Sequence, residues 1–184
     1  MRGHWRSILV ILGLFFAVPA PGARAQDPAP AEAALNVPVI PSGRLSAEQL
    51  APVAAAIRRL EANPLASDGM EARRNLLAWL TDSPDVTVSM CQHVVPAPAQ
   101  NSETSGITMT QFLFSSAAFI IEHPDQAKDP VAVNLAGLQG ALRTYELLKA
   151  RRGNAAKNRD LEKLLERRER GELEAYVRAG LARC

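Results

Sequence analysis

Apolar residues in the segment that begins at Ser46 recur at steps of three and four, which places them on one face of a helix. These residues are Leu50, Val53, Ile57 and Leu60. Ser46 and Gln49 match the S-x-x-Q capping box, in which each side chain accepts a hydrogen bond from a backbone N–H that the helix start leaves unpaired. The pattern predicts a helix that starts after Ser46 and ends at Asn63-Pro64.

Two more helices are predicted before residue 125. Asp68 and Glu71 cap the first, whose apolar residues are Met70, Leu76, Leu77, Trp79 and Leu80. Residues 96–108 are mostly polar and small and are predicted to form a loop. Thr108 then caps a helix that ends at Glu122-His123-Pro124, with one face formed by Met109, Phe112, Leu113, Ser116, Phe119 and Ile120.

The clearest helical pattern follows Asp129-Pro130. One stripe is large and apolar, and consists of Val131, Leu135, Leu138, Leu142 and Tyr145. A second stripe is small, and consists of Ala132, Ala136 and Gly140. Because small residues let a neighbouring helix approach closely, we expect this helix to be central. After Gly153, two shorter amphipathic helices are predicted on either side of Gly171, with apolar residues Leu161, Leu164, Leu165, Leu173, Tyr176, Val177 and Leu181.

The segment DSPDVTVSMCQHVV, residues 82–95, carries two competing patterns. Ser83-Pro84-Asp85 is typical of a helix start, with a capping hydroxyl, a proline and an acid near the helix dipole. The alternation of Val86, Val88 and Met90 with polar residues instead favours a strand. A lone strand would leave its backbone groups unpaired, so a short helix over residues 84–95 is the preferred prediction.

These elements predict an all-α domain over residues 46–184, a compact bundle of five or six antiparallel helices with its core centred on residues 107–150. A helical-hairpin array is the alternative. Its motivation is that Ser83-Pro84-Asp85 and His123-Pro124-Asp125 lie forty residues apart, each after a predicted helix or near its end. In such an array the two Pro-Asp corners should superpose, and the protein would act as a helical-repeat adaptor.

Residues 1–25 have the three parts of a secretory signal peptide. A basic start is followed by an apolar run over residues 8–18 and by Ala23-Arg24-Ala25, which has small residues where a signal peptidase cleaves. Eleven apolar residues are too few to span a bilayer, which needs about 20. Residues 26–45 are rich in proline and alanine and are predicted to be a flexible leader. We therefore expect an exported protein, periplasmic or secreted, with no membrane anchor after cleavage.

Charge then argues against a nucleic-acid partner. The full chain has 21 Lys and Arg and 19 Asp and Glu, a formal net charge of +2. Cleavage would remove Arg2, Arg6 and Arg24 and leave a net charge near −1. In residues 157–170, KNRDLEKLLERRER, acids and bases lie three and four apart, which is typical of a solvated helix face. The expected partner is a protein or peptide.

The two cysteines, Cys91 and Cys184, are predicted to form a disulfide, because an even cysteine count in an exported chain usually means a bridge. An intermolecular bridge and free thiols are the alternatives. A catalytic alternative makes Cys91 a thiolate nucleophile with His123 as base and Asp125 to orient it. His123 is more simply a residue of the last helical turn, where an imidazole complements unpaired carbonyls. Neither a metal site nor a cofactor is expected.

No dinucleotide fingerprint, phosphate loop, G-x-S-x-G or H-E-x-x-H motif occurs in the sequence. The sequence therefore favours a non-catalytic binding or interaction module, in which a groove between helices takes a peptide, a partner helix or a small apolar molecule. An enzyme with a thiol or acid–base site around Cys91, His123 and Asp125 is the alternative hypothesis, and a helical-repeat adaptor is the third.

Overall fold

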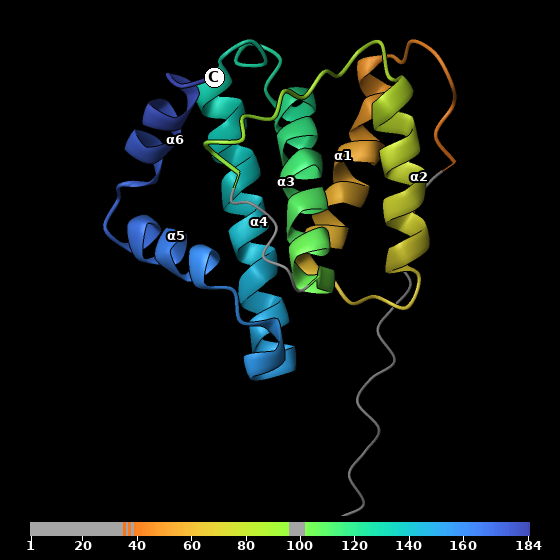
Figure 1. Ribbon diagram of the computed structural model, residues 1–184. Helices are drawn as coiled ribbons and strands as arrows, with labels where there is room; N and C mark the ends of the chain where they lie inside the picture. The colour runs from red at the N-terminus through yellow and green to blue at the C-terminus, as the bar shows by residue number, and fades with distance from the viewer. Residues whose placement is uncertain (1–34, 36, 38, 96–101) are drawn as a thin grey trace, which may run out of the picture. The chain divides into compact units, whose positions relative to one another are not determined.

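The computed structural model of the protein describes residues 35, 37, 39–95 and 102–184, and this part of the chain is all-helical, without strands (Figure 1). The all-α prediction is thus confirmed. The predicted signal peptide lies outside the described residues. The elements are α1 (Ala47–Ala62), α2 (Gly69–Asp82), α3 (Ser102–Glu122), α4 (Pro130–Arg152), the 3₁₀ turn η1 (Gly153–Ala156), α5 (Arg159–Glu169) and α6 (Leu173–Leu181).

Local signals set the ends of several helices where the sequence predicts them. The Ser46 and Gln49 capping box is present at α1, with both reciprocal hydrogen bonds. Asp129 caps α4 by accepting hydrogen bonds from two backbone N–H groups, and Pro130 is its first residue. Gly171 turns the chain between α5 and α6 with φ of 71°, a left-handed conformation that glycine adopts without strain.

Asp68 and Asp85 were predicted to lie at helix starts, but their carboxylates instead accept hydrogen bonds from the segment before α1. Asp68 makes no side-chain capping bond at α2, because its carboxylate accepts a hydrogen bond from Leu35 N at 2.7 Å. Asp85 accepts one from Leu45 N at 2.6 Å. Leu35 and Leu45 are both buried. Leu35 and Leu45 therefore contact the helices, whereas Val39 between them is 96% exposed. Most of residues 26–38 lie outside the described residues, and the flexible leader stays a prediction.

α2 buries a narrower face than its sequence pattern predicts. Leu76 is fully buried, but Met70 is 75% exposed and Leu77 is 42% exposed. The buried residues of α2 are Gly69, Ala72 and Leu76. A helix that contacts α1 and α3 along one side only needs no wider stripe, so the predicted apolar set was wrong at Met70 and Leu77.

α3 starts at Ser102, six residues before the predicted Thr108 cap, so residues 102–108 are helix and not loop. Thr108 does not cap, because its hydroxyl donates back to the carbonyls of Thr104 and Ser105. Both of those residues are buried. In the sequence, Thr104 and Ser105 look like loop residues because they are polar, but in the structure the helix and its neighbours provide their hydrogen-bond partners. By length and composition Glu103–Glu122 could also cross a membrane, and 61% of this window is buried within the protein.

α3 separates two apolar clusters. Phe112 contributes to a cluster with α4, α5 and α6, whereas Phe114, Ala117 and Ala118 contribute to a cluster with α1 and α2. In Figure 1, α1 and α2 lie on one side of α3, α4 lies on the other, and α5 begins beside the lower part of α4 and runs away from it at a steep angle. A helix with core on both sides needs apolar residues around most of its circumference, which explains why α3 is buried nearly all round.

The tightest packing in the described chain is between α3 and α4. A Cβ added to Gly137 would collide with Ser116 Oγ and lie 2.8 Å from the Phe112 carbonyl oxygen. A Cβ added to Gly140 would collide with Ser115. The prediction that the small residues of this helix let a neighbouring helix approach is therefore correct at Gly140. It is wrong at Ala132 and Ala136, which are only partly buried and line a surface cleft. The face that α4 presents to α3 includes Gly137, Gly140 and Ala141.

Residues 84–95 are neither the predicted helix nor a strand. The chain is extended from Val86 to Cys91 and then makes one turn, in which Val94 N and Val95 N donate to Cys91 O. Val86 packs in the cluster of α1 and α2, and Cys91 packs in the cluster of α4 to α6, so the segment crosses α3 (Figure 1). The segment must therefore span the width of α3. Five helical residues advance only about 7.5 Å, which is less than the ~10 Å diameter of a helix, whereas five extended residues advance about 16 Å.

The two Pro-Asp corners differ. After Pro84-Asp85 the chain is extended, and Asp85 pairs with Arg44 at 3.4 Å. After Pro124-Asp125 the chain makes turns that lead directly into α4, and Asp125 is exposed. The helical-hairpin array therefore receives no support from the structure at these corners.

The close approach of α3 and α4 predicts opposite effects for two glycine substitutions. Gly140→Ala should lower the free energy of unfolding by at least about 1–3 kcal/mol, because its Cβ has no space beside Ser115. Gly106→Ala, in the first turns of α3, should raise it by about 0.4–1 kcal/mol, because nothing lies within 4 Å of its added Cβ. Urea unfolding measures both. Equal effects of the two substitutions would show that the α3–α4 contact is placed wrongly.

Candidate functional site

The sulfur of Cys91 is bonded to Cys184, with an S–S distance of 2.00 Å and a sequence separation of 93. Cys91 is also buried, in the apolar cluster of α4 to α6. A half-cystine has no thiolate and cannot act as a nucleophile in this state. α6 approaches the turn after Cys91 closely, because a Cβ on Gly180 would lie 2.8 Å from the His93 carbonyl oxygen.

His123 and Asp125 are exposed residues at the end of α3 and in the turn that follows. The His123 ring lies against Phe119, with 4.6 Å between ring centroids, and its backbone N–H donates to Phe119 O. Within the described ranges, no hydrogen bond or ring contact joins His123 to Cys91 or Asp125. The structure therefore does not bring the three candidate catalytic residues together as a hydrogen-bonded site. Nor do described residues form a group of three or more potential metal ligands.

Glu61 is a buried carboxylate at the junction of α1, α3 and α4. It accepts hydrogen bonds from Arg143 Nε at 2.5 Å, from Ser115 Oγ at 2.8 Å and from Arg58 Nη1 at 3.1 Å. Burial raises the pKa of Glu61, but the hydrogen bonds from Arg143 and Ser115 and the charges of both arginines lower it further, so that the net direction is downward. An ionised, fully bonded carboxylate is a weak base for Ser115, and we interpret this cluster as structural.

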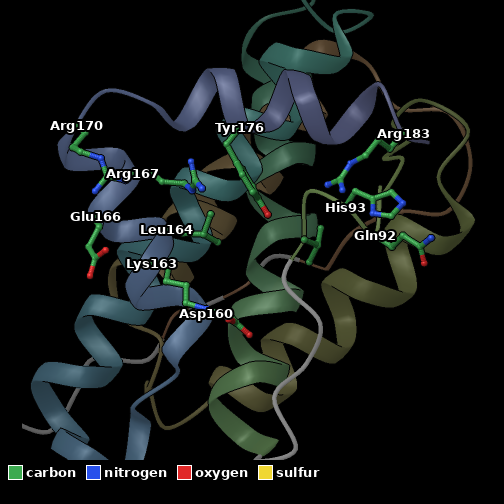
Figure 2. Close-up of a pocket in the computed structure, with 11 residues that line it drawn as sticks. Gln92, His93, Asp160, Lys163, Leu164, Glu166, Arg167, Arg170, Tyr176 and Arg183 are labelled. Carbon is green, nitrogen blue, oxygen red and sulfur yellow. Dashed lines mark hydrogen bonds and ion pairs between the residues drawn. The ribbon is translucent and has the colours of Figure 1, made fainter.

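A pocket of about 460 Å³ lies between the Cys91–Val95 turn, α5, α6 and the C-terminal residues (Figure 2). Four of its side chains are Lys or Arg, and two are acids. We call it the cationic pocket, and its lining residues are Gln92, His93, Val95, Asp160, Lys163, Leu164, Glu166, Arg167, Arg170, Tyr176 and Arg183. Its position beside the disulfide follows from the bond between Cys91 and the residue after Arg183.

α5 supplies one wall of the cationic pocket. Asn158 caps this helix by accepting hydrogen bonds from Asp160 N and Leu161 N. Steps of three, four and three residues then place Asp160, Lys163, Arg167 and Arg170 on the same side of the helix. The opposite side carries Leu161 and Leu165 into the core, which fixes the rotation of α5 and directs the charged residues at the pocket.

Tyr176 of α6 projects between Arg167 and Arg183 in the view of Figure 2. Its hydroxyl donates to Val94 O at 3.3 Å, and the Arg167 guanidinium lies 5.5 Å from its ring centroid. Burial raises the pKa of Tyr176, while the positive charges of Arg167 and Arg183 oppose that rise. The tyrosine thus links the turn and α5 at the centre of the pocket.

The pocket cations are weakly paired. Lys163 pairs with Asp160 at 3.2 Å, and Arg170 pairs with Glu172 at 2.9 Å, but all four side chains are about half exposed or more. Arg167 lies 3.8 Å from Glu172. Arg183 has no ion pair within the described part of the chain. Exposed ion pairs contribute only about 0–1 kcal/mol, so these cations can exchange partners with an incoming anion.

The sequence analysis did not identify this pocket. It interpreted residues 157–170 as a solvated helix face, and it gave the residues beside the two cysteines no role. The available signal was a combination of two features: the cations at steps of four and three on α5, and the position of Arg183 next to a cysteine expected to bond near His93.

Comparison with known proteins gives no family assignment, since the chain matches no protein-family model, no curated protein and no solved structure.

The disulfide predicts a large difference between oxidised and reduced protein. Reduction, or a Cys91→Ala, Cys184→Ala double variant, should lower the free energy of unfolding by about 4–5 kcal/mol, since the bond closes a loop of more than 90 residues in the unfolded chain. Urea unfolding measures the loss, and intact mass should show the oxidised monomer lighter than the reduced one by two hydrogens. Thiols that react with iodoacetamide before reduction would contradict the bond.

Glu61 predicts a defined acid sensitivity. Because its folded pKa is below the ordinary value of 4.5, its stabilisation is complete above pH 4.5 and is lost as the pH falls through the folded pKa. Glu61→Gln should therefore be less stable than the parent protein at pH 7 by about 1–3 kcal/mol, with a difference that shrinks below pH 4.5. Asp125→Asn is the exposed control and should change stability little at either pH. A pH-independent Glu61→Gln difference would exclude this role.

Proposed function

We propose that this protein is an exported, non-catalytic binding module, a compact antiparallel helical bundle whose cationic pocket takes part of a partner protein or peptide. The observation that carries the proposal is the pocket itself, a concave surface built from the Cys91–Val95 turn, α5, α6 and the C-terminal residues and containing four cationic side chains with weak internal pairing. Concave sites with convergent polar groups can fix the orientation of a ligand. The disulfide and the signal-like pattern of residues 1–25 support export.

Binding is favoured over catalysis because the groups that would do chemistry are engaged elsewhere. Cys91 is in a disulfide, and Glu61 is held by two arginines and a serine. His123 lies against Phe119 at the end of α3. In contrast, the pocket presents charges that can be redirected toward a ligand at little cost, together with the apolar surfaces of Val95 and Leu164.

Site-specific photo-crosslinking tests the proposal. A benzoylphenylalanine placed at Glu166, on the exposed rim of the cationic pocket, should form a defined adduct with one partner from an extract of exported proteins. The matched control places the same group at Arg74, an exposed position on α2 outside the pocket.

Competition makes the crosslink specific. An excess of unmodified protein should abolish the adduct, whereas an excess of an Arg167→Gln, Arg183→Gln double variant should compete less well, because it lacks two of the pocket cations. Identical adducts at Glu166 and Arg74, or equal competition by the variant, would place the partner elsewhere and overturn the proposal.

A further inference from the structure

We infer that the cationic pocket recognises an acidic peptide segment, with carboxylate side chains placed against Lys163, Arg167 and Arg183. This inference rests on the proposed binding function and specifies the chemistry of its ligand. The charge gathered in the pocket favours an anionic ligand. The chain without residues 1–25 has a net charge near −1, yet the pocket gathers four cations and His93 against two acids. A concave, partly apolar wall focuses such a field and attracts anions.

Two of the pocket cations, Arg183 and Lys163, are open to a ligand. Arg183 has no ion pair among the described residues, and its charge acts on Tyr176 at the pocket centre. Lys163 pairs only with Asp160, and the two side chains are 63% and 56% exposed. A ligand carboxylate would replace water or a weak surface partner at both positions, without breaking a buried interaction.

The spacing of the α5 cations matches that of side chains on one face of an extended peptide. Lys163 and Arg167 lie one helical turn apart on α5, a rise of about 6 Å. Alternate residues of an extended peptide point the same way and lie about 6.6–6.8 Å apart. An extended peptide with acids at every second residue would therefore place successive carboxylates against these two cations, and a third could reach Arg183 across the pocket, on the other side of Tyr176 (Figure 2).

The lining of the pocket favours a peptide over a denser polyanion such as a nucleic acid. Asp160 and Glu166 stand in the same lining and repel closely spaced phosphates. The aromatic ring of the pocket, Tyr176, already has Arg167 over it and its hydroxyl bonded to Val94 O, so it is a poor platform for base stacking. Val95 and Leu164 instead offer contact surface for the methylene groups of glutamate.

Fluorescence anisotropy on the full, oxidised chain tests the inference with a labelled nonapeptide of four Ser-Glu repeats and a final serine. Its affinity should fall as NaCl rises from 50 to 500 mM, and the same peptide with glutamine for glutamate should not bind. Arg183→Gln and Arg167→Gln should each weaken binding by about two- to fivefold, as expected for an exposed ion pair. Asp160→Asn should strengthen binding, because it removes a repelling carboxylate.

Arg74→Gln, an exposed α2 control, should leave the affinity unchanged, and thermal melts should show each variant folded. Equal binding of the glutamine peptide, or no effect of Arg183→Gln and Asp160→Asn, would overturn the inference. Tighter binding of a single-stranded oligonucleotide, or equal competition by inorganic phosphate, would also overturn it. If the Glu166 crosslink persists while these peptide results fail, the acidic ligand class is wrong and the binding function stands. If the crosslink fails as well, both are wrong.

Discussion

The contact between α3 and α4 is the constraint on which the rest of the described fold depends. Gly137 and Gly140 leave no side chain between the two helices, so Ser115 and Ser116 of α3 lie directly against the α4 backbone. Glu61 of α1 reaches the same place and bonds Ser115. This junction fixes α3 in position and orients its opposite faces, one toward the cluster with α1 and α2 and the other toward the cluster with α4, α5 and α6.

A second constraint is the covalent link across the two clusters. The extended segment after α2 carries the chain past α3, and the disulfide then fixes its end, Cys91, to the last residue of the tail. The bond holds Cys184 at Cys91, and the adjacent Arg183 therefore lies beside the turn that follows Cys91. The cationic pocket is therefore a product of tertiary structure: α5 supplies charges, and the bonded tail and turn make the surface concave.

Sequence reasoning succeeded where a helix end depends on its own residues and failed where a distant residue competes. The Ser46 capping box formed as predicted, because its two partners lie within one turn. Asp68 did not cap α2, since Leu35 N, 33 positions away, takes its carboxylate. Residues 84–95 have a helix-start pattern, but the distance between two cores keeps residues 86–91 extended. The pocket cations of residues 157–170 were interpreted as a solvated face, which is correct for α5 taken alone.

The charged side chains around Glu61 differ from those of the cationic pocket in burial and pairing, and this difference bears on function. Around Glu61, buried hydrogen bonds hold the carboxylate in one geometry, and moving a partner would weaken the compensation of a buried charge. In the cationic pocket, the pairs are exposed and Arg183 has none within the described chain. Charges of the first kind stabilise a fold but cannot respond to a ligand. Charges of the second kind add little stability and can be redirected, and because they gather where the disulfide has shaped a concavity, recognition of an anionic partner is the use that their arrangement favours.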